Sequence, residues 1–175
     1  MAEKRSSFVI FMNTTPDGAE ETYSVVGTGV TDLTVAYNPQ TSSEQFINQD
    51  SANSEVTGYQ PNAPVTLQVN KGEPVYEYVN ELRLKRAAYG DAYTDILLVD
   101  AFDSVQTRYA AEKQPVTIQI DTYGGAAADP LSIGFTINFR GNGETGTFDK
   151  DTKKFTKGTG TQTFSAEVKK IEKTK

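Results

Sequence analysis

Residues 46–89 read FINQDSANSEVTGYQPNAPVTLQVNKGEPVYEYVNELRLKRAAY, and this stretch passes from a polar segment through a strand pattern into a helix pattern. Val65, Leu67 and Val69 alternate with polar residues, as on a half-buried strand. From Pro74 onward, apolar residues recur at the i, i+3, i+4, i+7 spacing of one helix face. We expect that face to be a buried core stripe made of Val75, Tyr78, Val79 and Leu82.

The predicted helix has recognisable ends. Pro74 suits the first helical position, where its missing N–H costs nothing. Glu73 and Glu77 lie at the positive end of the helix dipole, and basic residues follow near its negative end. We expect Gly90 to end the helix, because glycine is favoured just past a helix C-terminus.

Alternation with a period of two residues dominates the rest of the chain. Every position of Leu131–Arg140 obeys the strand pattern, with Leu131, Ile133, Phe135, Ile137 and Phe139 on one face. Ile96–Val99 is apolar on both faces, which indicates a central strand covered on both sides. Further predicted strands are Phe8–Asn13, Thr22–Val26, Val30–Tyr37, Thr94–Phe102, Thr107–Ala111, Val116–Ile120, Thr145–Asp149 and Phe164–Ile171. The sequence therefore predicts a mainly β fold with one flanking α-helix.

The residue types present restrict the available chemistry. The 175 residues include no Cys and no His, which excludes thiol nucleophiles, imidazole bases, disulfides and Cys/His zinc sites. No apolar run approaches the roughly 18 residues of a membrane span, and the N-terminus has too short an apolar stretch for a secretory signal. We therefore expect a non-enzymatic protein without cofactor or metal, used without Sec export and without a membrane partner.

The net charge of −6 is unevenly distributed. Residues 6–70 contain seven carboxylates and no Lys or Arg, whereas residues 150–175 contain eight Lys and three acidic residues. An acidic solvated face with a basic tail explains this pattern. A sharper interpretation is a surface that must not bind nucleic acid, because a duplex-binding protein needs a basic groove.

Three motifs could suggest chemistry, and each has a structural alternative. Asp95, Asp100 and Asp103 resemble a glycosidase carboxylate set, but we interpret them as surface acids because no Trp is present as a sugar platform. Asp149 and Asp151 could bind Ca²⁺, but the lysines around them favour a plain β-turn.

Residues 141–143, Gly-Asn-Gly, lack the Lys-Ser/Thr of a phosphate-binding loop. Asn-Gly between two strands instead predicts a hairpin.

The segment Thr41–Asn62 is interpreted as a long loop. Structureless loops of this length are uncommon in compact domains unless they are functional or disordered. The segment carries scattered apolar residues, whose exposure to water on an isolated monomer would bring no stability. We hypothesise that it is an inter-ring assembly loop, ordered by a partner, with the anchors Phe46, Ile47, Val56, Tyr59 and Pro61.

The sequence resembles the major tail tube proteins of long-tailed, non-contractile (siphovirus-type) bacteriophages. The resemblance is carried by Phe46–Asn48 followed by Val56–Pro61, by Gly72–Tyr76 with Val79 and Leu82, and by the strand from Leu131 with residues 141–149, GNGETGTFD. None of these pieces is a catalytic signature, so the resemblance depends on their order and spacing.

The resemblance implies a β-sandwich or barrel. The length of 175 residues fits a single tail tube domain over residues 1–175, and the polar end at 169–175 is expected to fray. The resemblance also implies homohexameric rings that stack by self-assembly into a hollow conduit for DNA ejection. DNA would pass without specific binding, and the other partners would be tail proteins such as the tape measure and terminator. The expected location is the virion tail, assembled in the bacterial host cytoplasm.

Two other functions stay open at this point. A monomeric β-sandwich binding module, for example for carbohydrate, would show an exposed aromatic platform. The inner tube of a contractile injection system shares the implied fold and would need a sheath partner.

Overall fold

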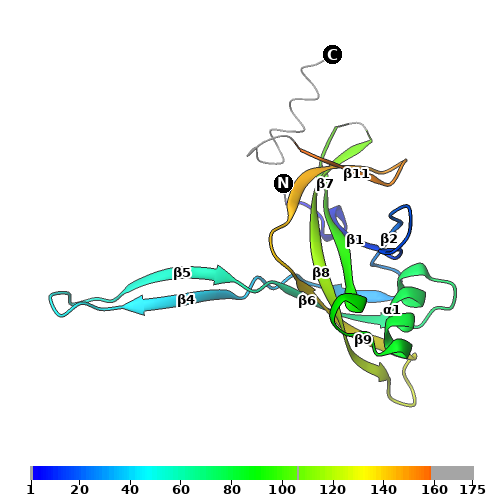
Figure 1. Cartoon of the computed structure of the whole chain (residues 1–175), viewed down its shortest axis with the longest axis horizontal. Coiled ribbons are helices and arrows are strands. Elements are labelled where there is room, and N and C mark those ends of the chain that lie inside the picture. Colours follow the sequence, from blue (N-terminus) through cyan, green and yellow to red (C-terminus); the bar gives the residue numbers. More distant parts are fainter. Residues whose placement is uncertain (1, 106, 159–175) are drawn as a thin grey trace.

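The computed structural model describes residues 2–105 and 107–158, and the strand predicted at Phe164–Ile171 and the end predicted to fray lie outside them. Figure 1 shows a body built from a curled antiparallel sheet with one α-helix, and a long ribbon projecting from it. The fold prediction of a mainly β chain with one flanking helix is confirmed. The elements are η1 Arg5–Ser7, β1 Phe8–Asn13, β2 Tyr23–Val25, β3 Val30–Leu33, β4 Pro39–Glu44, β5 Asn53–Tyr59, β6 Asn62–Gln68, α1 Pro74–Lys85, η2 Tyr89–Ala92, β7 Tyr93–Val105, β8 Arg108–Gly124, β9 Ser132–Phe139, β10 Glu144–Asp149 and β11 Lys154–Lys157.

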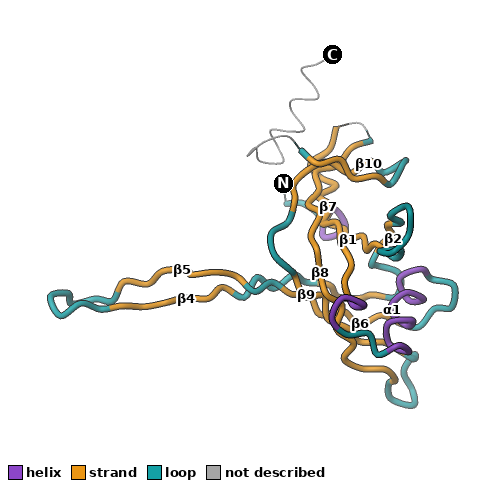
Figure 2. The backbone as a smooth tube through the Cα atoms, in the orientation of Figure 1, coloured by secondary structure: helices purple, strands orange, loops and turns teal. Residues whose placement is uncertain are grey.

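The strands of the body form one sheet in the order β2-β1-β7-β8-β9-β6-β3. β8 is long enough to pair with β7 on one edge and with both β9 and β10 on the other. β11 pairs with β10 and completes this corner of the body. The ribbon of β4 and β5 is a separate two-stranded sheet (Figure 2).

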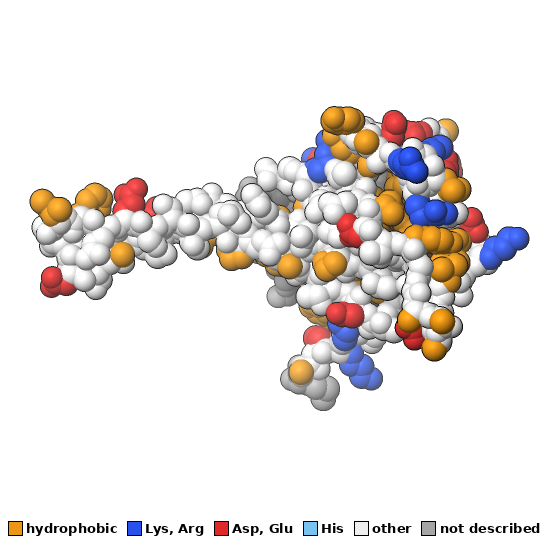
Figure 3. All heavy atoms as spheres, turned by 90° about the horizontal axis from the view of Figure 1, so that it is seen from below, with side chains coloured by type: hydrophobic (Ala, Val, Ile, Leu, Met, Phe, Trp, Pro, Cys, Tyr) orange, Lys and Arg blue, Asp and Glu red, His pale blue; other side chains and the backbone are white. Residues whose placement is uncertain are grey.

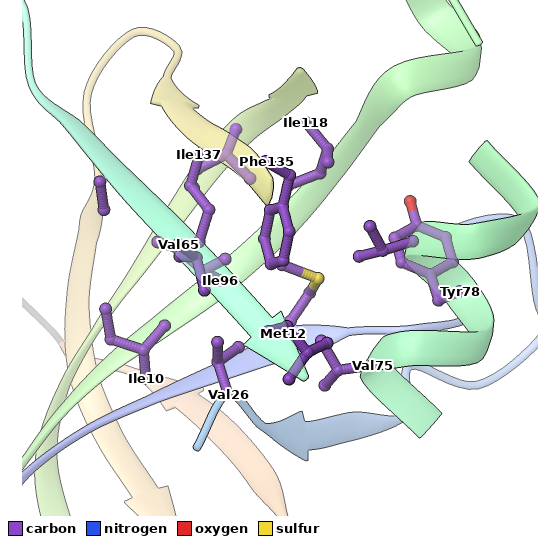
Figure 4. Packing of buried hydrophobic residues seen from close by; sticks show 14 of the residues in the cluster. Ile10, Met12, Val26, Val65, Val75, Tyr78, Ile96, Ile118, Phe135 and Ile137 are labelled. Carbon is purple, nitrogen blue, oxygen red and sulfur yellow. The ribbon is translucent and has the colours of Figure 1, made fainter. Parts of the chain in front are cut away.

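The main core lies between the concave side of the sheet and α1. All four residues of the predicted helix stripe are buried there, with Val79 fully enclosed. Their partners come from strands distributed over the whole sheet (Figure 4). Labelled members of this cluster are Ile10, Met12, Val26, Val65, Val75, Tyr78, Ile96, Ile118, Phe135 and Ile137.

A second, smaller core lies on the opposite side of β7. Ile96 and Leu98 belong to the main cluster, whereas Leu97 and Val99 pack in the smaller one with Tyr23 and Phe148. The alternation of side chains along a strand places these two pairs on opposite faces. β7 is therefore covered on both sides, as its apolar sequence predicts.

The start of α1 follows its sequence signals, but its end does not. A Glu73 Oε2 atom accepts a hydrogen bond of 2.8 Å from the backbone N–H of Tyr76, and Pro74 opens the helix. The prediction that Gly90 ends the helix is wrong. α1 ends at Lys85, because Arg86 takes the left-handed conformation with φ 49° and the N–H of Ala87 bonds to the carbonyl of Leu82.

The predicted hairpin at Gly141–Gly143 is also wrong. β9 and β10 both pair with β8 rather than with each other, so the chain leaves β8 briefly and returns to the same edge. The buried Gln114 side chain fills this interruption, because its Nε2 donates to the carbonyls of Arg140 and Gly141.

Candidate assembly surfaces

The segment predicted as a loop at Thr41–Asn62 is mostly a β-ribbon, which corrects the sequence interpretation. We call residues 39–59 the arm. Its strands β4 and β5 pair in register from Pro39 opposite Tyr59 to Glu44 opposite Asn53, with a bulge after Gln40. Every residue of β4 is exposed, and the arm extends along the long axis of the molecule, away from the body (Figure 1). An isolated two-stranded ribbon is marginally stable in water.

The register gives the arm two different faces. Ser42 and Glu44 lie opposite Glu55 and Asn53, which makes one face acidic. The other face carries Thr41 opposite Val56 and Ser43 opposite Ser54, and it is neutral with small side chains. Residues 39–59 contain three carboxylates and no Lys or Arg. Both outer edges of the arm also present backbone groups that a further strand could bond.

The tip of the arm is a hydrogen-bonded turn rather than an irregular loop. The N–H of Gln49 bonds to the carbonyl of Phe46 at 3.0 Å, and the Gln45 side chain bonds to the carbonyl of Gln49 at 3.0 Å. Ile47 occupies a corner of this turn and is fully exposed, while Phe46 is 55% exposed. The turn thus holds two adjacent apolar side chains in solvent.

The other predicted anchors lie closer to the body. Val56 is on the neutral face of the arm, and Tyr59 is at the root, where its ring lies edge-on to that of Tyr37 at 6.5 Å. Pro61 is half-buried, and its carbonyl accepts the N–H of Phe139. The five predicted anchor residues therefore do not form one cluster: two are at the tip, one is along the ribbon and two are at the root.

The three acids singled out in the sequence do not all lie on one face of the sheet. Strand alternation places Asp95 and Asp100 on opposite faces of β7. Burial raises the pKa of Asp95. The Lys113 Nζ atom, 3.8 Å from Asp95 Oδ2, offsets part of this increase. Burial and the nearby Asp103 raise the pKa of Asp100. Burial and Asp100 likewise raise the pKa of Glu112.

Asp149 forms the β-turn that the sequence favours over a Ca²⁺ site. Its Oδ1 accepts the backbone N–H groups of Asp151 and Thr152, and its Oδ2 accepts the hydroxyl of Thr107. The bond from Thr152 is the main cause of a lowered pKa for this carboxyl. Within residues 2–105 and 107–158, no group of three or more acidic side chains is arranged to hold a metal ion.

A cavity beside the end of α1 was not singled out in the sequence. It has a volume of about 640 Å³ and lies between the last turn of the helix, the connection through η2 and the middle of β8. The Arg83 guanidinium stacks on the Tyr123 ring at 4.0 Å, and its Nε donates to Asn80. The sequence predicts for Arg83 and Arg86 only the role of stabilising the negative end of the helix dipole. Sequence spacing does not reveal that β8 packs beside them.

Comparison with known proteins shows the fold of this chain. No family model matches the sequence, and no curated protein matches it. One similar solved chain is from the tail of an empty gene transfer agent particle with C6 symmetry, with a TM-score of 0.59, 13% identity, and coverage of 81% of this chain and 97% of the other. Another is from the virion of a native gene transfer agent particle, with a TM-score of 0.58, 11% identity, and coverage of 82% and 98%. In the described part of the chain, no helix is long and apolar enough to cross a membrane.

Proposed function

We propose that this protein is the structural subunit of a phage-type tail tube, in which homohexameric rings stack into a hollow conduit for DNA. The observation that carries the proposal is the exposed arm on a body with the fold of a gene transfer agent tail chain. That tail was solved with C6 symmetry, which supports a sixfold ring. The proposal makes the protein a virion component with a structural rather than catalytic role.

The arm has the physical properties of a segment that a neighbouring copy stabilises. Its ribbon gains little from the body, its outer edges pair with no other described strand, and its tip holds Phe46 and Ile47 in solvent. Burying these two side chains against a neighbour would contribute about 3–6 kcal/mol before the ordering cost is subtracted. We infer that the arm makes the contacts between rings.

The charge of the chain suits a conduit for DNA. The net charge is −6, and the seven carboxylates of residues 6–70 lie on the β1–β2 connection, β3 and the arm. A bore lined by some of them would repel the phosphate backbone and let the DNA slide without specific binding. The partners in this proposal are further copies of the chain, the tape measure and terminator proteins, and DNA in transit, with assembly in the host cytoplasm.

Self-assembly of the purified protein tests the proposal. At increasing concentration, negative-stain electron microscopy should show rings or tubes with a central channel. An arm-shortened variant, in which residues 43–54 are replaced by Asn-Gly so that Ser42 and Glu55 close a hairpin in register, should fold and fail to form tubes. A wild-type protein that stays monomeric at high concentration would favour the binding-module alternative and contradict the proposal.

A further inference from the structure

The cavity beside α1 is a groove whose lining combines cationic and apolar side chains. We define the helix-end groove by Arg83, Arg86, Ala87, Tyr89, Ile120 and Tyr123. Ala87 is half-buried and Tyr89 is 89% exposed, so apolar surface lines part of the groove and stays open to solvent. The Arg83 guanidinium lies over the Tyr123 ring at 4.0 Å, and Arg86 directly precedes Ala87, so cationic and apolar groups are interspersed in the lining.

These two guanidinium groups form no ion pair within the described residues. The one carboxylate in the lining, Asp121, already accepts hydrogen bonds from Gln119 at 2.7 Å and from Thr136 at 2.6 Å. Two guanidinium groups against this one carboxylate leave the lining with a net positive charge next to apolar surface. An occupant of matching chemistry must bring acidic groups beside apolar side chains.

The tip of the arm has this chemistry. Phe46 and Ile47 lie in a fixed turn, with Glu44 and Asp50 within a few residues of them, and the arm has no basic residue. On the face shown in Figure 3, the arm carries acidic and hydrophobic side chains but no basic ones, whereas the body carries basic, acidic and hydrophobic side chains. Another cavity on α1, lined by Glu77, Glu81 and Leu84, has the wrong charge for this tip.

The positions of arm and groove favour contact between different copies. The arm projects to one end of the long axis of the molecule, and α1 lies toward the other end (Figure 1). With a rise of about 3.3 Å per residue, the arm is about 25–30 Å long, comparable to the width of a small domain. Donor and acceptor surfaces at opposite ends make a heterologous contact, which repeats without closing and so builds a stack.

We propose that the arm tip of one copy docks in the helix-end groove of a copy in the next ring. Phe46 and Ile47 pack against Ala87 and Tyr89, and the carboxylates of the tip lie near Arg83 and Arg86. This inference rests on the proposed tube function and names the acceptor site for the arm. Another tail protein would accept this arm only if it presented a groove of the same chemistry.

Cysteine cross-linking of assembled protein tests the contact, because the natural chain has no cysteine. The double variant Asn48→Cys with Ala88→Cys pairs the tip with the groove lining in the α1–η2 connection, and Asn48→Cys with Leu84→Cys is the control, because Leu84 lies on α1 and lines the other cavity. A short bismaleimide should link the first variant in tubes into a ladder of multimers on denaturing gels and leave the control mostly monomeric. Tubes that form but give no ladder, or equal ladders in both variants, overturn the docking site while the tube function stands.

Charge reversal gives an independent measurement. Arg86→Glu should raise the concentration needed for tube formation by about tenfold or more, whereas Lys71→Glu, the same charge change on the exposed β6–α1 connection, should not. Asp50→Lys combined with Arg86→Glu should recover part of the loss. Equal effects of the Arg86 and Lys71 changes would overturn the inference, and an absence of tubes from wild-type protein would overturn the function on which it rests.

Discussion

The rings of Phe11 and Phe148 lie with their centroids 4.7 Å apart and their planes inclined by 44°. Phe11 is on β1 and Phe148 is on β10, so this contact joins the β10–β11 hairpin to the face of the sheet opposite α1. Phe148 is 1% exposed and is the most enclosed aromatic side chain of the smaller core, which it shares with Tyr23 and the partly buried Phe11. The stability of this side of the body therefore depends in large part on the packing of Phe148.

Replacing Phe148 by Ala should lower the free energy of unfolding by about 3–5 kcal/mol, because the truncation removes a fully buried aromatic ring and leaves a cavity in the smaller core. Urea unfolding followed by circular dichroism measures the loss. Phe102→Ala, at a side chain that is 52% exposed on β7, is the matched control and should change stability by less than about 1 kcal/mol. A Phe148 variant as stable as this control would mean that the hairpin does not depend on the smaller core.

Gly146 should not tolerate a side chain. A Cβ atom at this position would lie 2.2 Å from the backbone oxygen of Thr156 on β11. Gly146→Ala should therefore destabilise the protein by about 1–3 kcal/mol, since a backbone atom cannot move aside cheaply. Gly58→Ala on the arm, where a Cβ would meet nothing within 4 Å, is the control. Thermal unfolding of both variants measures the difference, and equal midpoints would contradict this close approach.

The elements predicted well are those with one buried face. β1 spans the predicted Phe8–Asn13, and α1 begins at Pro74 as predicted. A buried face imposes a period on the sequence, and Pro is favoured at the first position of a helix. Both signals are local, so one sequence is enough to find them.

The arm was missed as a ribbon because neither of its faces is buried. Without a buried face, β4 and β5 show no alternation of polar and apolar residues, although Thr41 and Val56 are directly opposite each other. The sequence did point to the arm as a candidate assembly site through Phe46 and Ile47. The shape of the arm depends on cross-strand backbone hydrogen bonds, and these do not require polar and apolar residues to alternate along the sequence.

β8 was predicted as two strands, Thr107–Ala111 and Val116–Ile120, and Pro115 lies in the part of β8 between them. The missing N–H of Pro115 falls where residues 140–143 leave the edge of β8, so no ladder bond is lost. The buried Gln114 side chain bonds to the departing chain instead. The hydrogen bonds of Gln114 join segments that are distant in sequence, so the spacing of neighbouring residues could not predict them. The helix-end groove was missed for the same reason.

Glu112 predicts a dependence of stability on pH. Burial and the nearby Asp100 raise the pKa of Glu112 above its ordinary value of 4.5 in the folded protein. The folded state therefore binds more protons than the unfolded chain, and stability falls as the pH rises from about 4.5 through the folded pKa. Glu112→Gln should raise the urea midpoint at pH 7 and change it little at pH values below the unfolded pKa. A lower midpoint at pH 7 would mean that the ionised carboxylate is stabilising.

Hydrogen exchange should distinguish the arm from the body before assembly. In single chains, the amides of residues 39–44 and 53–59 should exchange far faster than those of β7 and β8, because the ribbon has solvent on both faces and no core to protect it. In assembled tubes the same amides should become protected, since neighbouring copies would cover the ribbon. Mass spectrometry of peptides from the arm and from β8 measures both states. Arm amides that are as protected in single chains as those of β8 would show a ribbon that needs no partner. Arm amides that stay unprotected in tubes would contradict its role in joining copies.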